Sequence, residues 1–91
     1  MSIYSTIKDL YPEIEFQELE GFEDAVIGLE IEQNRLVYSV GSILEILQQK
    51  MSRVEACAKF ELVIRQTKFD GVAPLFIDDD YWNLICILNT L

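Results

Sequence analysis

The sequence predicts a single α+β domain, residues 1–91, in which a small, three-stranded, mainly antiparallel sheet packs against helices in the order α-β-β-α-α-β-α. Three observations lead to this prediction. Alternating apolar residues at 25–39 are typical of a β-hairpin, and two capped segments between residues 39 and 68 repeat apolar residues at helical spacing. A short apolar run with a proline, at 72–77, suits a third strand.

A helix is expected at residues 2–10, where apolar residues recur at helical spacing and Pro12 forces an end just beyond. An acidic segment at residues 13–24 follows. Apolar residues up to Phe16 alternate there with polar ones, which is a weak strand signal, and Gly21 marks a turn.

The hairpin is the clearest element, with Gln33-Asn34 at its tip. In the register that separates apolar from charged side chains, Ile31 pairs with Leu36. Leu29 then pairs with Tyr38, so that these four apolar side chains share one face and the charged ones share the other. Asn is acceptable at the positive-φ position that such a turn needs.

Two abutting helices are expected after the hairpin. Ser39 or Ser42 caps the first, which runs to about Met51. The sequence Ser52-Arg53-Val54-Glu55 has the pattern of a capping box, so a second helix starts there and runs to about Lys68. The stripe of this second helix that faces the core is expected to consist of Cys57, Phe60, Val63 and Ile64.

A third strand at 72–77 and a fourth helix complete the pattern. Pro74 favours an edge position or a strand start. The aspartates at 78–80 suit the N-terminus of a helix from Tyr81 to about Thr90, which is apolar on nearly every side. Such a helix lies either centrally in the core or partly against a partner. In the second case the expected oligomer interface consists of Trp82, Ile85 and Leu88.

The net charge of the chain favours some classes of binding partner and disfavours others. Sixteen acidic residues stand against seven basic ones, which gives a net charge of −9. Because nucleic acids and anionic membranes attract Lys and Arg, direct binding to either is not expected. A partner protein with a basic surface would be attracted, since complementary charge speeds an encounter. The alternative is that the negative charge serves solubility alone.

The sequence favours a cytoplasmic location. The first residues lack the basic and then apolar segments of a signal peptide. The longest apolar run, Leu84–Leu88, is too short to span a bilayer. Cys57 and Cys86 lie among apolar residues and are expected to be buried reduced thiols, although a disulfide between them is geometrically possible.

The residue types offer little for catalysis. The chain has no histidine, which removes the commonest general base and the commonest zinc ligand. It also lacks the glycine-rich phosphate loops and the G-x-S-x-G motif. The aspartates at 78–80 resemble part of a calcium loop, but Trp82 and Leu84 stand where ligands and glycine belong, which favours helix capping. No catalytic residue, cofactor or metal is predicted, and an enzyme is not expected.

The acidic segment is the best candidate for binding a partner. Its acids are interleaved with apolar and aromatic residues, which suits either a buried anchor row or a surface that binds basic residues. A solvated loop or edge strand is the alternative. Together with the aspartates before the fourth helix, the candidate partner-binding residues are Glu13, Glu15, Glu18, Glu20, Glu23, Asp24, Asp78, Asp79 and Asp80.

The run Phe22-Glu23-Asp24-Ala25-Val26-Ile27-Gly28 resembles a family of small, mostly uncharacterised bacteriophage proteins with the core motif F-[DE]-D-A-x-I-G. The resemblance covers about residues 22–78. It departs from the family at the glycine-rich segment before the last strand, where this chain has only Gly71, and residues 79–91 have no counterpart. The other matching pieces are Tyr38, Ile43-x-x-Ile46-Leu47, Met51, Glu55-Ala56, Phe60 and Pro74-Leu75-Phe76.

The resemblance implies an origin in a phage or mobile element and brings no catalytic residue with it. Small acidic phage proteins without catalytic motifs often bind and inhibit host defence proteins, including CRISPR systems, and this is the function expected here. Two alternatives stay open: a self-assembling structural or accessory phage protein, for which a homo-oligomer is expected, and an immunity protein that neutralises a basic toxin.

Overall fold

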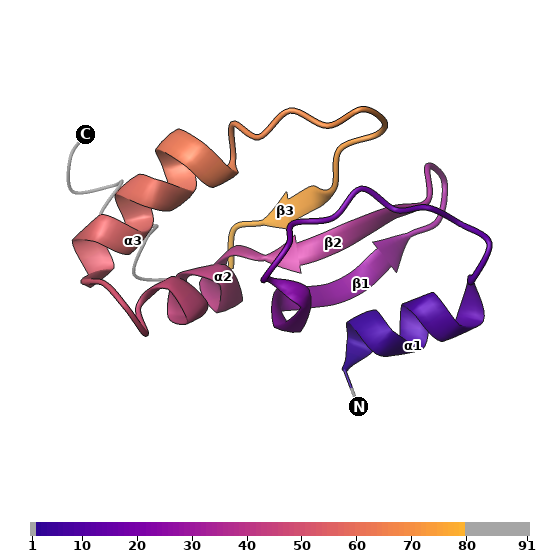
Figure 1. Cartoon of the computed structure of the whole chain (residues 1–91), viewed down its shortest axis with the longest axis horizontal. Coiled ribbons are helices and arrows are strands. Elements are labelled where there is room, and N and C mark those ends of the chain that lie inside the picture. Colours follow the sequence, from indigo (N-terminus) through magenta and orange to yellow (C-terminus); the bar gives the residue numbers. More distant parts are fainter. Residues whose placement is uncertain (1, 80–91) are drawn as a thin grey trace.

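A three-stranded sheet in the order β1-β2-β3 forms the centre of the computed structural model, which describes residues 2–79 (Figure 1). β1 (Val26–Glu30) and β2 (Arg35–Ser39) are antiparallel, and β3 (Leu75–Ile77) runs parallel to β2. The predicted α+β class is confirmed. The parallel pairing, which the sequence did not predict, arises because the helices that follow β2 and then the connecting segment 65–74 carry the chain from the end of β2 back to its beginning (Figure 1).

The first helix, α1 (Ile3–Leu10), confirms the prediction for this segment. Ser2 is its N-cap and accepts a hydrogen bond from the backbone N–H of Ser5. Ile7 is buried on the side that faces the sheet, and α1 lies along β1 (Figure 1). The helix ends before Pro12, which cannot continue it.

The predicted hairpin register is wrong by two residues. Leu29 pairs with Leu36, and Ile31 lies in the connecting loop with 73% of its surface exposed. Glu30 explains the difference, because its carboxylate accepts the backbone N–H of Gln33 and pairs with Arg35, which closes a longer loop. Asn34 takes the positive φ that the sequence predicted for this turn, with a value of 54°.

Two helices follow β2 directly. Ser39 caps α2 (Val40–Leu47), and Ser52 caps α3 (Arg53–Lys59) through the predicted capping box with Glu55. α3 runs on into a π-helical turn, η2 (Phe60–Ile64), so the helical segment ends earlier than the predicted Lys68.

The buried stripe of this helical segment differs from the predicted one. Ala56, Phe60 and Ile64 are buried, whereas Cys57 is only half-buried and Val63 is 57% exposed. The cause is the π turn, in which the backbone N–H of Arg65 donates to the carbonyl of Phe60 at 2.8 Å. The wider turn keeps Ile64 on the face of Phe60 and turns Val63 outwards.

The third strand lies at the sheet edge and begins directly after Pro74, as the proline indicated. It is shorter than the predicted 72–77, because residues up to Pro74 make no ladder pairing with β2. The predicted fourth helix lies outside the described residues, together with its proposed interface residues Trp82, Ile85 and Leu88 and the acidic residue Asp80.

The core lies on one face of the sheet. Tyr38 and Phe60 are fully buried and both contact Phe76, with ring centroids 6.0 Å and 5.5 Å away respectively. Among residues 2–79, no helix is long and apolar enough to cross a membrane.

Candidate functional site

Residues 13–24, here called the acidic loop, form no strand, so the weak strand signal at Phe16 is wrong. The loop is nevertheless anchored: Phe16 and Leu19 are each 7% exposed and belong to the hydrophobic core. The backbone N–H of Leu19 donates to the Tyr38 hydroxyl at 2.9 Å, and burial raises the pKa of that hydroxyl. The loop therefore lies across the face of the sheet that carries the core, and several of its acidic side chains are exposed.

Glu18 is the one acid of the loop that binds side chains of another element. Its carboxylate accepts hydrogen bonds from the Tyr4 hydroxyl (2.7 Å) and from the Lys8 ammonium group (2.9 Å), both on α1. The bond to Glu18, together with burial, raises the pKa of Tyr4 to about 12. Glu18 therefore ties the loop to α1 and is already occupied within the protein.

The remaining acids of the loop fall into two groups. Glu23 opens a short 3-10 turn, η1 (Glu23–Ala25), and accepts the backbone N–H of Gly21 at 3.3 Å. Gly21 has a φ of 90°, a conformation that glycine adopts without steric cost. The other four are exposed and have no hydrogen-bond or ion-pair partner among residues 2–79: Glu13, Glu15, Glu20 and Asp24.

The negative charge is concentrated in the part of the chain that contains this loop. Residues 1–39 hold nine acidic and two basic residues, a net charge of −7 out of the total of −9. Both basic residues bind acids of the same part, Lys8 with Glu18 and Arg35 with Glu30. In Figure 1 this part lies at the end of the molecule opposite α3. The exposed acids of the loop are thus not compensated by basic residues of their own segment.

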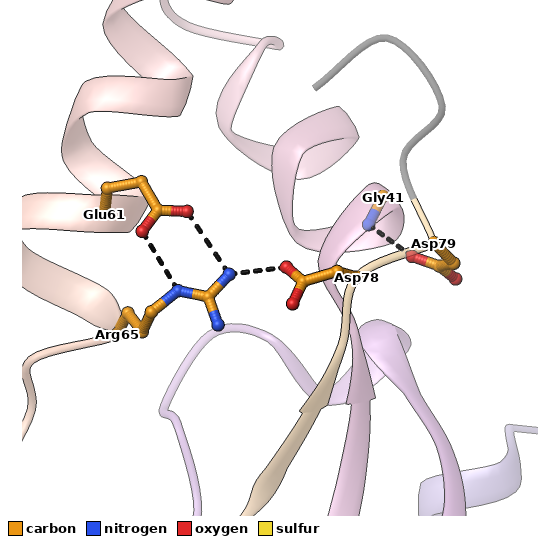
Figure 2. Close-up of polar contacts among 5 residues, drawn as sticks. All are labelled: Gly41, Glu61, Arg65, Asp78 and Asp79. Carbon is orange, nitrogen blue, oxygen red and sulfur yellow. Dashed lines mark hydrogen bonds and ion pairs between the residues drawn. The ribbon is translucent and has the colours of Figure 1, made fainter. Parts of the chain in front are cut away.

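Asp79 belongs to a different arrangement (Figure 2). Its carboxylate accepts the hydroxyl of Ser39 at 2.6 Å and the backbone N–H of Gly41 at 2.8 Å, and so reinforces the N-terminus of α2. Partial burial opposes ionisation of this carboxyl, but the two hydrogen bonds prevail and lower its pKa. Asp79 therefore has a structural role that the sequence pattern did not reveal.

Asp78 contacts Arg65 at the end of the π turn, as Figure 2 shows. The guanidinium group also pairs with Glu61 and lies 4.6 Å from the ring centroid of Phe60. Burial alone would lower the pKa of Arg65, but its bonds to Asp78 and Glu61 raise it. Arg65 thus connects the end of β3 to the π turn.

The structure accordingly divides the nine predicted partner-binding residues. Asp78 and Asp79 follow β3 at the same end of the sheet as Glu23 and Asp24, which precede β1, but on the opposite edge strand. Glu18, Asp78 and Asp79 are occupied by contacts within the chain. Within the described segment, no group of three or more His, Cys, Asp or Glu residues is placed to hold a metal ion.

Comparisons with known proteins give no match: no family model, no curated protein and no solved structure matches this chain. Proposals about function therefore depend on the geometry of the acidic loop and on the expectations drawn from the sequence alone. Of these two supports, only the loop identifies individual residues that an experiment can change.

Proposed function

We propose that this protein acts without catalysis, as an inhibitor of phage or mobile-element origin that binds a basic surface of a host defence protein in the cytoplasm. The observation that carries the proposal is the acidic loop. Its backbone is fixed by Phe16, Leu19 and the Tyr38 hydroxyl, while four of its carboxylates stay exposed.

A fixed backbone favours binding because little conformational entropy is lost when the partner docks. The exposed acids are spread over a segment of twelve residues, 13–24, so several Lys or Arg residues of a partner can bind them together. Charge of one sign also raises the rate of encounter with a basic surface and makes this rate fall as salt is added. Salt-sensitive binding is therefore the signature of this function.

The test compares two charge variants with the same change in net charge. Glu13→Lys/Glu20→Lys changes the loop by four charge units at residues that have no hydrogen-bond or ion-pair partner in the described part of the chain. Glu45→Lys/Gln49→Lys/Ala58→Lys changes the net charge equally at exposed residues of the α2–α3 region. Each tagged protein, with the unchanged chain, serves as bait in host lysate at low and at high salt, and captured proteins are identified by mass spectrometry.

We expect the unchanged chain and the α2–α3 variant to capture one defence protein or complex. The loop variant should not capture it, and high salt should release it. We expect its affinity for the loop variant to fall about tenfold or more. Equal capture by both variants would show that the acidic loop is not the binding surface. Capture of a toxin in place of a defence protein would instead support the immunity function.

Self-assembly is a third candidate, and the exposed apolar side chains on the outer side of α3 and η2 favour it. Val54 is 81% exposed and Leu62 is 75% exposed, more than is usual for large apolar residues. A concentration-dependent mass in light scattering at tens of micromolar would support a homo-oligomer. A constant monomer mass would count against it.

A further inference from the structure

The outer side of α3 and η2 shows a regular pattern of exposure. From residue 56 to residue 67 the burial of side chains repeats every four residues, with one buried residue followed by one half-buried and two exposed ones. In an ordinary α-helix, with about 3.6 residues per turn, rows of this spacing rotate around the axis, and the wider π turn of η2 reduces this rotation. Each row of the pattern therefore runs nearly straight along the helical segment.

One of the two exposed rows is apolar and consists of Val54, Ala58 and Leu62. Val54 is 81% exposed and Leu62 is 75% exposed, so no part of residues 2–79 covers this row. Its pattern has a small residue at the centre and a large one four positions away on either side. Such a row fits itself when two copies of the helix pack antiparallel. Each Val54 then meets Leu62 of the other copy, and the two Ala58 residues meet at the centre, where their small size lets the helices approach closely.

The neighbouring exposed row begins with Glu55 and Lys59. Among the described residues Lys59 has no hydrogen-bond or ion-pair partner, and the carboxylate of Glu55 accepts only the hydroxyl of Ser52. In the antiparallel arrangement centred on Ala58, Glu55 of each copy lies about 3 Å along the axis from Lys59 of the other. The charged row is thus complementary to itself in the same arrangement as the apolar row, and two ion pairs can form.

The distribution of charge over the whole chain favours contact at this face. Because the net charge is −9, repulsion opposes the association of two copies. Residues 50–68 hold five basic and two acidic residues, a net charge of +3, and this segment includes α3 and η2. The acidic part, residues 1–39, lies at the opposite end of the molecule (Figure 1). Contact through α3 and η2 therefore keeps the acidic parts of the two copies far apart.

We propose that the exposed face of α3 and η2 binds the same face of a second copy of this chain, with the two helices antiparallel, in a dimer with two-fold symmetry. Dimers of this symmetry are the commonest assemblies, because each copy contributes the same surface. The acidic loop stays accessible in both copies. The proposal gives the self-assembly candidate a defined geometry and does not depend on the inhibitor function.

The first test measures the mass of the purified full chain by light scattering at concentrations up to about 1 mM. Leu62→Glu puts a carboxylate into the apolar row. Ile31→Glu is the matched control, because Ile31 is 73% exposed and lies in the loop between β1 and β2. We expect the unchanged chain and the control to approach the mass of a dimer as concentration rises, and Leu62→Glu to raise the dissociation constant at least about tenfold. Circular dichroism checks that each variant is folded.

The second test exchanges the charges of the neighbouring row. Glu55→Lys and Lys59→Glu each place like charges opposite one another in the antiparallel dimer, so each should weaken it. The double variant Glu55→Lys/Lys59→Glu restores both ion pairs and should associate about as strongly as the unchanged chain. A head-to-tail contact between this face and the acidic loop of the next copy predicts a different result, since Glu55→Lys would then strengthen association.

Four results would overturn the proposal: a monomer mass at every concentration, a mass that grows beyond the dimer, a dimer that Leu62→Glu leaves unchanged, or a double exchange that restores nothing. Because the measurement contains no host component, it can fail while the proposed function holds, and the reverse. The α2–α3 variant separates the two directly. Its Ala58→Lys change brings two ammonium groups together at the centre of the dimer, so it should be monomeric and still capture the host protein.

Discussion

Asp78 and Asp79 are neighbours in the chain and both bind groups of the protein, yet their partners differ. Asp79 accepts a buried hydroxyl and a backbone N–H at the start of α2, whereas the side chain of Asp78 is 60% exposed and meets Arg65 at the surface. Capping bonds to a helix N-terminus stabilise by more than exposed ion pairs do. The two residues therefore form a matched pair for mutation.

We expect Asp79→Ala to lower the free energy of unfolding by about 1–2 kcal/mol and Asp78→Ala by about 0.5 kcal/mol or less. For a domain of this size each kcal/mol corresponds to roughly 4–8 °C in melting temperature, so thermal unfolding followed by circular dichroism resolves the difference. If Asp78→Ala proved the more costly change, the role assigned to Asp79 would be wrong.

The lowered pKa of Asp79 predicts that the stability of the protein depends on pH. Folding lowers the pKa of Asp79, so its stabilisation is fully present above the ordinary pKa of an aspartate, 3.8, and is lost as the pH falls through the lower folded value. Asp79→Asn should remove this part of the acid sensitivity. In Asp78→Asn, the loss of stability between pH 5 and pH 2 should stay closer to that of the unchanged protein.

Residue roles of this kind were hidden in the sequence because the partners lie far apart along the chain. Asp79 binds Ser39, forty positions away, and Glu18 binds Lys8, ten positions away on another element. A list of acidic residues cannot separate those that bind partners within the chain from those that face solvent. Local signals were more successful: Ser2, Ser52 and Asn34 take the roles that their residue types favour.

At the scale of elements, the π turn has the clearest physical consequence. It adds one residue to the helical turn between Phe60 and Ile64, so that these two residues stay in the core while Val63 is turned away from it and is 57% exposed. The sequence prediction assumed an α-helix throughout and therefore placed Val63 in the core. The prediction of the hairpin register was wrong for a comparable reason. The contacts of Glu30 with Gln33 and Arg35 define a longer loop than the alternation of apolar residues suggested.

Deleting Leu62 should convert the π turn into ordinary α-helix. Ile64 would then follow Phe60 at a spacing of three residues, which keeps both on one face, and we expect a loss of no more than about 1 kcal/mol. Deleting Ala58 from α3 should rotate Phe60 and Ile64 by about 100° away from the core and cost several kcal/mol. Urea denaturation measures the free energy of unfolding of both deletion variants. Equal losses of free energy would contradict the assignment of the extra residue to the π turn.

At the scale of the whole molecule, the net charge and the α+β class could be read from the sequence, whereas the strand order could not. The parallel position of β3 depends on Phe76 packing against both Tyr38 and Phe60, a contact between three distant segments. The uneven distribution of charge is visible in the sequence, but its meaning depends on the fold. Only the structure shows that the exposed acids lie on a loop anchored by Leu19 and Tyr38.

This concentration of like charge should lower stability, because repulsion between the acids is relieved when the chain unfolds. In low-salt buffer we therefore expect Glu13→Lys/Glu20→Lys to raise the melting temperature by a few degrees. The variant Glu45→Lys/Gln49→Lys/Ala58→Lys should raise it less, since its changes lie outside the most acidic part of the chain. The difference should shrink in 0.5 M salt, where the screening length falls to about 4 Å.

This last prediction also bears on function. A loop variant that melts higher but no longer binds would show that Glu13 and Glu20 are used for recognition at a cost in stability, as is common at functional sites. The loss of binding could not then be ascribed to unfolding. If the loop variant melts no higher than the α2–α3 variant in low salt, repulsion is not concentrated at the loop, and the acids there act as part of a generally solubilising surface.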